Sequence, residues 1–374
     1  MINKKRLIKL AQDLIRIDSR NPDRDEYKIA LFTKQYLTKF RVNSRIYEFK
    51  KRRLNVVSEL YKNKSESLLI TPHLDTVPAG TGWKYDPFAA TVNNGRIYGV
   101  GATDCKVNLA VAMEVMNSLV EDGVSLDYKL IFAATADEES GSVYGLFPLL
   151  EKKILKPKAA LVLDADEFEV IVAQKGLLHI KIKVAGRRAH GAYPWLGVNA
   201  IDAALKITQD LKSMKFDYIM NKYLHPPTMN IGTIHGGDKV NVVADWCEFE
   251  LDFRFLPGTD AEELVGRIKN TVKKHALKYK IEIEGIQKPY NINENHPLVK
   301  CFMSSAKTHG VRSSIKGSEG ATVISFFQEK GIPAIATGFG CHDCAHAVNE
   351  YLEIDNLYKG AIVLEDFLKR FKFH

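Results

Sequence analysis

Imidazole and carboxylate groups gather in short segments of this 374-residue chain, which are PHLD from Pro72, GATD from Gly101, ADEES from Ala136, LDAD from Leu163 and CHDCAHAVNEY from Cys341. Two histidines and several carboxylates, with no thiolate required, are ligands that suit a borderline divalent ion such as Zn²⁺. The number of these candidate ligands exceeds the number that one catalytic zinc ion uses. Two ions about 3.5–4 Å apart, bridged by one carboxylate, would employ them all.

Apolar segments with the character of strands precede most of these groups, and they span residues 56–60, 68–71, 130–134, 160–163 and 332–337. Helical patterns at 108–119 and 142–152 lie between several of them. Strands that alternate with helices predict an α/β sheet covered on both faces. Ligands of such sheets gather beyond the carboxyl ends of strands, so the position of the polar groups predicts one shared site.

Each residue taken alone also has a simpler interpretation. Asp137 could cap a helix, with Glu138 and Glu139 favoured in its first turn by the helix dipole. Asp75 or Asp104 could be a turn residue, and Asp164 could begin a loop. A single histidine is often exposed or hydrogen-bonded in a core. The agreement of five segment ends favours the metal centre over five separate explanations.

The pattern changes near Lys175, where an alternating strand (178–184) indicates a sheet with one solvated face. A helical segment (199–214), two strands (229–234 and 247–255), a helix capped by Asp260 and a further strand (280–284) follow. This β-α-β-β-α-β order is a self-contained two-layer unit. We therefore expect a discontinuous catalytic domain (1–174 and 286–374) with an inserted small domain (175–285).

The charge and composition exclude several classes of function. The net charge of +8 is spread along the chain apart from small clusters such as Lys50–Arg53, which we interpret as a solvated basic face rather than a nucleic-acid site. The N-terminal segment has the spacing of an amphipathic helix, not of a signal peptide, and no apolar run reaches membrane-spanning length. Five cysteines, scattered except for Cys341 and Cys344, favour a reducing, cytoplasmic setting.

Longer motifs occur in a fixed order: HLDTVPAG, GVGATDCK, ADEESGS, GRRAHGAYPWLGVNAI, NVVADWCEFELDFR and HAVNEY. They resemble the di-zinc metallopeptidase family that includes acetylornithine deacetylase, succinyl-diaminopimelate desuccinylase, aminoacylase-1, glutamate carboxypeptidase and the tripeptide aminopeptidases. The resemblance covers nearly the whole chain. It implies a mixed-sheet zinc-peptidase catalytic domain with an inserted dimerisation, or lid, domain.

The resemblance also implies a ligand for each metal. His73 and Asp164 resemble ligands of one zinc, Glu139 and His346 resemble ligands of the other, and Asp104 resembles the carboxylate that bridges them. Asp166 competes with Asp164 for its role, and His342 is assigned to the loop before the ligand His346. Co²⁺ and Mn²⁺ are alternatives to Zn²⁺.

The same resemblance assigns roles beyond the metals. Glu138 corresponds to the general base, and Asp75 to the carboxylate that orients His73. His190 corresponds to a residue that reaches into the partner subunit of a homodimer and stabilises the oxyanion. Asn241 and Arg254 correspond to substrate-binding positions.

The implied activity is hydrolysis of the amide bond of an N-acyl amino acid or short peptide. The implied alternatives on the same site are tripeptide-aminopeptidase-like and carboxypeptidase activities. Three departures from the family pattern bear on the substrate: Asp164 where deacylases and carboxypeptidases usually have Glu, GSEGAT (317–322) where many members have a Ser/Thr-Asp pair, and Cys105 after the bridging carboxylate.

Other classes of function fit less well. A redox protein or a zinc knuckle would use Cys341 and Cys344, but a knuckle needs a second ligand pair. A serine hydrolase would need a G-x-S-x-G elbow, and Cys105 has no assigned base. A dinucleotide site at Gly99-x-Gly101 would need glycine where Asp104 stands. A catalytically inactive metal-binding module would lack a ligand or the base, and none is missing.

Overall fold

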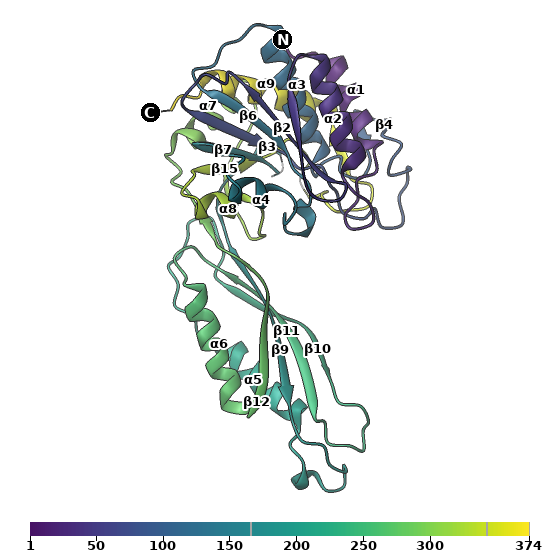
Figure 1. Ribbon diagram of the computed structural model, residues 1–374, viewed down its shortest axis with the longest axis vertical. Helices are drawn as coiled ribbons and strands as arrows, with labels where there is room; N and C mark the ends of the chain where they lie inside the picture. Colours follow the sequence, from purple (N-terminus) through teal and green to yellow (C-terminus); the bar gives the residue numbers. More distant parts are fainter. Residues whose placement is uncertain (165–166, 342, 374) are drawn as a thin grey trace. The chain divides into compact units, whose positions relative to one another are not determined.

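The computed structural model describes residues 1–164, 167–341 and 343–373 (Figure 1). The chain divides into two compact units. Unit 1 comprises Met1–Val172, Ile292–Lys316 and Thr322–His374, and unit 2 comprises Ala173–Asn291 and Gly317–Ala321. Unit 2 begins slightly before and ends slightly after the inserted segment expected at 175–285. It also includes the short segment 317–321, which was expected in the larger domain.

Unit 1 is built on a mixed sheet in the order β1-β2-β6-β3-β7-β15-β8. Neighbouring strands are parallel from β6 to β15 and antiparallel elsewhere. The strands are β1 (Ser44–Lys50), β2 (Arg53–Leu60), β3 (Ser67–Thr71), β6 (Lys129–Ala134), β7 (Ala159–Leu163), β8 (Val170–Gln174) and β15 (Ala334–Thr337). Every residue of β3 and β7 is buried, because a parallel sheet is covered on both faces. The mixed α/β fold predicted from the sequence is confirmed.

The helices of unit 1 are α1 (Lys4–Ile15), α2 (Tyr27–Lys39), α3 (Lys106–Glu121), α4 (Leu146–Glu151), α7 (Pro297–Thr308), α8 (Ile324–Glu329) and α9 (Ile354–Arg370). Helix α3 packs against α1 and α9 (Figure 1). The helix expected at 142–152 begins only at Leu146. Residues Glu138–Ser140 form a 3₁₀ turn, and Ser142 has a φ of +61°, which an α-helix does not allow.

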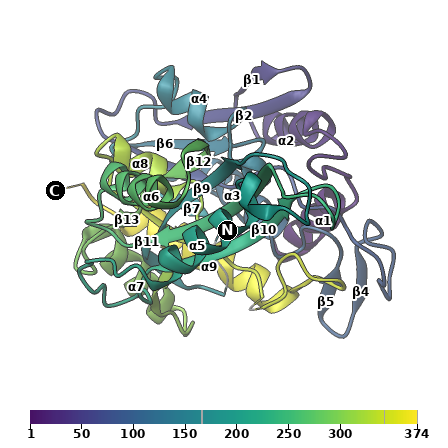
Figure 2. The same ribbon diagram turned by 90° about the horizontal axis from the view of Figure 1, so that it is seen from below.

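A small sheet in the order β16-β5-β4 joins distant parts of unit 1. Its strands are β4 (Thr91–Asn93), β5 (Arg96–Tyr98) and β16 (Tyr351–Glu353). Figure 2 shows β4 and β5 as a ribbon at the edge of the unit. The antiparallel pairing of β5 with β16 places the residues that follow Tyr98 beside those that precede Tyr351.

Unit 2 has the predicted β-α-β-β-α-β order, and its antiparallel sheet runs β10-β11-β9-β12. Its elements are β9 (Gly176–Ala185), α5 (Ala200–Ser213), β10 (Thr228–Gly236), β11 (Trp246–Phe255), α6 (Ala261–His275) and β12 (Lys278–Gln287). The short strands β13 (Tyr290–Asn291) and β14 (Ile315–Ser318) pair with β8 and belong to the mixed sheet. Alternate residues of β11 are buried against both helices in one hydrophobic core. Asp260 caps α6, as expected, by accepting the Glu262 N–H at 2.8 Å. In the described ranges, no helix combines the length and hydropathy needed to cross a membrane.

Candidate metal centre

The carboxyl ends of the parallel strands β3, β6 and β7 lie at one edge of the unit 1 sheet. The residues that follow them are His73 after β3, Glu138 and Glu139 after β6, and Asp164 after β7. Asp104 follows β5, and His346 lies between β15 and β16. The chain therefore brings the predicted ligands together from segments that are far apart in sequence.

His73 is the centre of the first group. Its Nε2 lies 2.9 Å from Asp104 Oδ1 and 3.4 Å from Asp164 Oδ1. Single ligand atoms of His73, Glu138 and Asp164 all lie within 4.8 Å of one another. Asp166, the competitor of Asp164 in the sequence, lies outside the described residues.

His346 is the centre of the second group. Its Nε2 lies 3.0 Å from Asp104 Oδ2 and 3.3 Å from Glu139 Oε2. Asp104 is therefore shared, because Oδ1 faces His73 and Oδ2 faces His346. A carboxylate placed in this way can bridge two cations.

The charges of these groups fit cations. Hydrogen bonds to Asp104 and Glu139 raise the pKa of His346 to about 11. Burial lowers the pKa of His73, but Cys105 and the surrounding carboxylates raise it well above its ordinary value. Among the described residues, Glu139 Oε1 is buried without a hydrogen-bond partner. The clustered carboxylates are stabilised by nearby positive charge, and divalent ions bound between the imidazoles and the carboxylates would supply it.

Asp75 is fully buried beside the His73 ring, with its Oδ1 3.7 Å from His73 Nδ1. The same Nδ1 lies 3.0 Å from the backbone oxygen of Asp75. The Asp75 carboxylate accepts the N–H groups of Glu138 at 3.1 Å and Glu139 at 3.2 Å. Burial raises the pKa of Asp75, but these contacts hold it below its ordinary value. One carboxylate therefore positions an imidazole and both acidic residues.

Glu138 has the electrostatic environment of a proton acceptor. Burial and the nearby charge of Asp164 raise its pKa well above the ordinary value of a glutamate. A carboxyl group with a raised pKa can exchange a proton near neutral pH. A cation bound to the cluster would act in the opposite direction and favour the carboxylate.

Buried polar residues that no sequence motif indicates support the cluster from behind. Asn21 Nδ2 donates to Asp75 Oδ2 at 2.9 Å, and Arg53 Nη2 donates to Asp137 Oδ1 at 2.7 Å. Arg53 Nε lies 2.8 Å from Glu26 Oε2, a close contact without hydrogen-bond geometry. The Lys50–Arg53 cluster, interpreted as solvated, therefore ends in a buried arginine.

Asp137 does not act as the helix cap considered for it. It has a φ of +65°, and its side chain makes no capping hydrogen bond to the 3₁₀ turn that follows. Its carboxylate instead pairs with Arg53 and accepts the Tyr144 N–H at 3.0 Å. The turn that presents Glu138 is thus held by a buried ion pair.

The cysteines lie beside the cluster. Cys105 is fully buried, its sulfur accepts the His73 N–H at 3.2 Å, and burial raises its pKa to about 12. A thiol with this pKa stays protonated and is a poor nucleophile.

Cys344 Sγ lies 3.2 Å from Thr103 Oγ1. Within the described part of the chain, neither Cys341 nor Cys344 joins a candidate metal group. His342 lies outside the described residues.

His190 and Asn241 lie together on unit 2. Gly191, next to His190, donates its N–H to the backbone oxygen of Asn241 at 2.8 Å. Both His190 and Asn241 are exposed. His190 Nδ1 accepts the Ala192 N–H at 3.0 Å, which fixes the ring to its own loop.

Arg254, the other residue expected to bind substrate, lies on β11 and already has an anionic partner. Its Nε and Nη2 donate to the two oxygens of Asp252 at 2.7 and 3.0 Å. This fork uses the Nε and Nη2 edge of the guanidinium, and its five N–H donors are not all taken. Asp252 also lies 3.5 Å from His179 Nε2.

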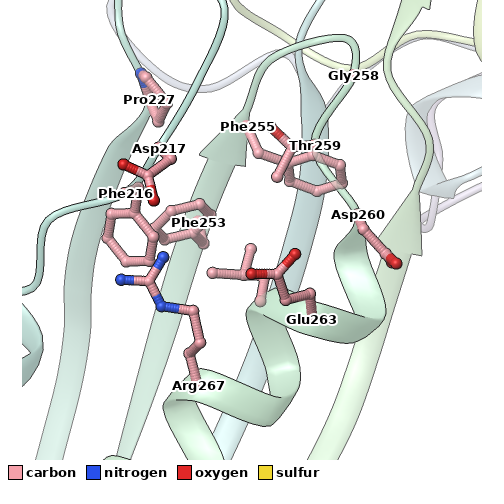
Figure 3. A pocket seen from close by; sticks show the side chains of 11 residues that line it. Phe216, Asp217, Pro227, Phe253, Phe255, Gly258, Thr259, Asp260, Glu263 and Arg267 are labelled. Atoms are coloured by element: carbon pink, nitrogen blue, oxygen red, sulfur yellow. The ribbon is translucent and has the colours of Figure 1, made fainter.

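Unit 2 also contains a cavity of about 110 Å³ between the end of β11 and the start of α6 (Figure 3). Phe216 and Phe253 form part of its wall, with ring centroids 4.7 Å apart. The Arg267 guanidinium lies 5.2 Å from the Phe216 ring. Arg267 therefore already occupies the position at the Phe216 ring that a cationic ligand would take. The candidate metal groups of the described residues all lie in unit 1.

Residues 69–370 match Peptidase family M20/M25/M40. The chain belongs to this family. The match covers most of the chain, and it confirms the resemblance drawn from the motifs. As a member of the M20/M25/M40 family, the protein is a metallohydrolase that acts on peptide or amide bonds.

Individual relatives extend the comparison. An uncharacterized metallohydrolase of Methanococcus maripaludis is 30% identical, with 97% of this chain and 98% of the relative covered. The acetylornithine deacetylase of Vibrio atlanticus is 30% identical, with 85% of each covered. A tripeptidase of Staphylococcus aureus has a similar structure, with a TM-score of 0.81, 26% identity and coverage of 99% of this chain and 98% of that one.

Proposed function

We propose that this member of the M20/M25/M40 family uses two divalent ions to hydrolyse the amide bond of an N-acyl amino acid or a short peptide. The main support is the position of Asp104, whose two oxygens face His73 and His346 at 2.9 and 3.0 Å. His73 and Asp164 would hold one ion, and Glu139 and His346 would hold the other. Asp104 would contact both.

When bound, Zn²⁺, or Co²⁺ or Mn²⁺ in its place, lowers the pKa of a water molecule and polarises a carbonyl group. Glu138 would accept the proton of the attacking water and deliver it to the leaving amine. Asp75 would keep His73 in the tautomer that directs Nε2 to the cluster, because it lies on the Nδ1 side of the ring.

We also propose that two copies of the chain form a homodimer through unit 2. Strand β10 ends the unit 2 sheet, so one of its edges has no neighbouring strand within that sheet. Trp195, Leu196 and Val240 are exposed on loops joined by the Gly191–Asn241 hydrogen bond. Exposed apolar side chains beside a free strand edge favour association. His190, exposed on the same loop, would then stabilise the oxyanion in the partner's site.

Two substrate classes follow from the relatives. The Vibrio atlanticus relative is an acetylornithine deacetylase, which supports an N-acyl amino acid. The Staphylococcus aureus structure is a tripeptidase, and Asp164 in place of glutamate is closer to the aminopeptidase pattern. Asn241 and Arg254 are the proposed substrate-binding residues. The five free cysteines accord with a cytoplasmic location.

A substrate panel tests this proposal. The zinc-loaded protein is assayed against N-acetyl amino acids, dipeptides, and tripeptides with free or blocked N-termini. We expect hydrolysis of one class, loss of activity after chelation and recovery after Zn²⁺ is added back. Cleavage restricted to peptides with a free N-terminus would assign the aminopeptidase activity. A chain that binds no divalent ion, or hydrolysis unaffected by chelation, would overturn the metal-dependent mechanism.

A further inference from the structure

Glu350 is a buried carboxylate directly beside the loop that carries Asp104. Its side chain is almost entirely excluded from solvent, with 2% of the residue exposed. Its Oε1 accepts the N–H groups of Thr103 at 2.8 Å and Asp104 at 2.9 Å. Its Oε2 accepts the N–H group of Gly101 at 2.8 Å. One side chain therefore binds three backbone groups of a four-residue segment that ends at the shared carboxylate.

The small sheet of unit 1 brings these residues together. Tyr98 of β5 pairs with Tyr351 of β16, and the Gly99 N–H donates to the backbone oxygen of Glu350 at 3.0 Å. Thr103 Oγ1 donates to the Tyr351 backbone oxygen at 2.7 Å. The loop is thus fixed at its start by strand pairing and at its end by Glu350.

Only an acidic side chain satisfies all three N–H groups. A carboxylate offers two oxygens that both accept, whereas the amide of glutamine would turn an N–H₂ group towards one of the donors. Converging backbone N–H groups form a concavity that favours an anion. The geometry therefore depends on the acceptor oxygens of Glu350.

We propose that Glu350 is a positioning residue of the metal centre. By holding the backbone of residues 101–104, it aims one oxygen of Asp104 at His73 and the other at His346. This role rests on the metal-dependent hydrolysis proposed above, because it acts through the bridging carboxylate. It predicts that a change at Glu350 weakens the binding of both ions, although Glu350 contributes no ligand atom to the candidate groups of the described residues.

Glu350→Gln and Glu114→Gln form a matched pair for the test. Glu114 is also fully buried, and its carboxylate also accepts three N–H groups, from the Asn3 backbone and from Nε and Nη2 of Arg6. Both variants replace a buried acceptor oxygen with an N–H₂ group, and Glu114→Gln also weakens the ion pair with Arg6, but only Glu350 holds the loop of Asp104. Zn²⁺ affinity is measured by competition with a chromophoric chelator, and the absorption spectrum is recorded with each variant saturated with Co²⁺.

We expect Glu350→Gln to bind Zn²⁺ roughly 10–100-fold more weakly than the wild type, the range typical for a lost hydrogen-bond partner outside the ligand set. Its Co²⁺ spectrum should shift, and its kcat should fall at saturating metal with little change in KM. Glu114→Gln should keep the wild-type affinity and spectrum even if its melting temperature falls.

Several results would overturn the role of Glu350. These are wild-type affinity and spectrum in Glu350→Gln, or equal losses in both variants, which would indicate general destabilisation. If Glu350→Gln does not fold, the same Zn²⁺ affinity is measured for Glu350→Asp. Its shorter carboxylate cannot reach all three N–H groups, so a wild-type affinity in Glu350→Asp would refute the role. A wild-type chain that binds no metal would instead refute the proposed function.

Discussion

Arg53 and Asp137 form a buried ion pair, with Arg53 Nη2 2.7 Å from Asp137 Oδ1. Asp137 directly precedes Glu138, and its φ of +65° turns the chain after β6. The two residues are separated by 84 positions in sequence, so the pair joins β2 to the turn that presents the proposed base. The position of Glu138 therefore depends on the Arg53 guanidinium, which has no role in the proposed reaction.

Arg53→Met should destabilise the fold strongly. Removing one partner of a buried ion pair leaves an uncompensated charge, which typically costs about 3–5 kcal/mol. The measurement is chemical denaturation followed by circular dichroism. Arg52→Met is the control, because the neighbouring Arg52 pairs with Asp25 but is 46% exposed. Equal stability of the two variants would contradict a special role for Arg53.

Glu26 should make stability depend on pH. Burial, with the charge of Asp75 adding to it, raises the pKa of Glu26 from 4.5 to about 8. The folded protein therefore keeps a proton on Glu26 that the unfolded chain has lost above about pH 4.5. The resulting stability is fully present below that pH and is lost as the pH rises through 8.

The comparison of wild type with Glu26→Gln isolates this effect. The stability of the wild type relative to the variant should fall by roughly 1 kcal/mol per pH unit between about pH 5 and 8. Denaturation midpoints of both proteins at several pH values provide the measurement. Parallel curves across this window would show that Glu26 does not hold a proton in the folded state.

The sequence predicts the proposed metal ligands better than it predicts the buried residues behind them, such as Arg53. His73, Glu139 and Asp164 follow strands whose apolar runs are evident, and parallel strands end at one edge of a sheet. Arg53 has no such signal, because it stands in a run of four basic residues of which the preceding Arg52 is largely solvated. Pattern alone does not distinguish the two arginines. Arg53 is buried because it contacts Asp137, which lies far away in the chain, whereas Arg52 pairs with Asp25 and stays partly exposed.

Local patterns explain the remaining successes and errors. The alternation in β11 predicts its buried face because the period of a strand fixes it, and Asp260 caps α6 because the cap is a local hydrogen bond. The start of α4 was placed too early because the backbone conformation of Ser142 has no sequence signature. The role of Glu350 depends on strand pairing between β5 and β16, which no local pattern reveals.

Glu138→Gln and Glu139→Gln should have different effects. Glu138→Gln removes the proton acceptor but leaves the contacts between His346, Glu139 and Asp104, so both metals should remain while activity falls by orders of magnitude. Glu139→Gln should lose one ion, because Glu139 Oε2 lies 3.3 Å from His346 Nε2. Metal content by elemental analysis and kcat distinguish the two. Metal loss in Glu138→Gln that accounts for its inactivity would mean that the base is misassigned.

Cys105→Ala should remain an active hydrolase. The Cys105 thiol is fully buried, and burial raises its pKa to about 12, so it is not a thiolate at neutral pH. We expect kcat/KM within about tenfold of the wild type, since only one buried hydrogen-bonded sulfur is removed. Steady-state kinetics with Zn²⁺ present provide the measurement. Complete loss of activity with both metals retained would revive a cysteine nucleophile.

Mixing inactive variants tests whether His190 acts across a dimer. His190→Ala keeps Glu138, and Glu138→Gln keeps His190, so each mixed dimer would contain one complete site if His190 serves the partner subunit. Random exchange of equal amounts makes half of the dimers mixed, which restores about a quarter of the wild-type sites. The control mixes Glu138→Gln with His73→Ala, two changes in the same unit 1 cluster, which cannot complement each other in this way. Restored activity in the first mixture alone places His190 in the partner's site, whereas no restoration in either mixture confines it to its own subunit or removes it from the reaction.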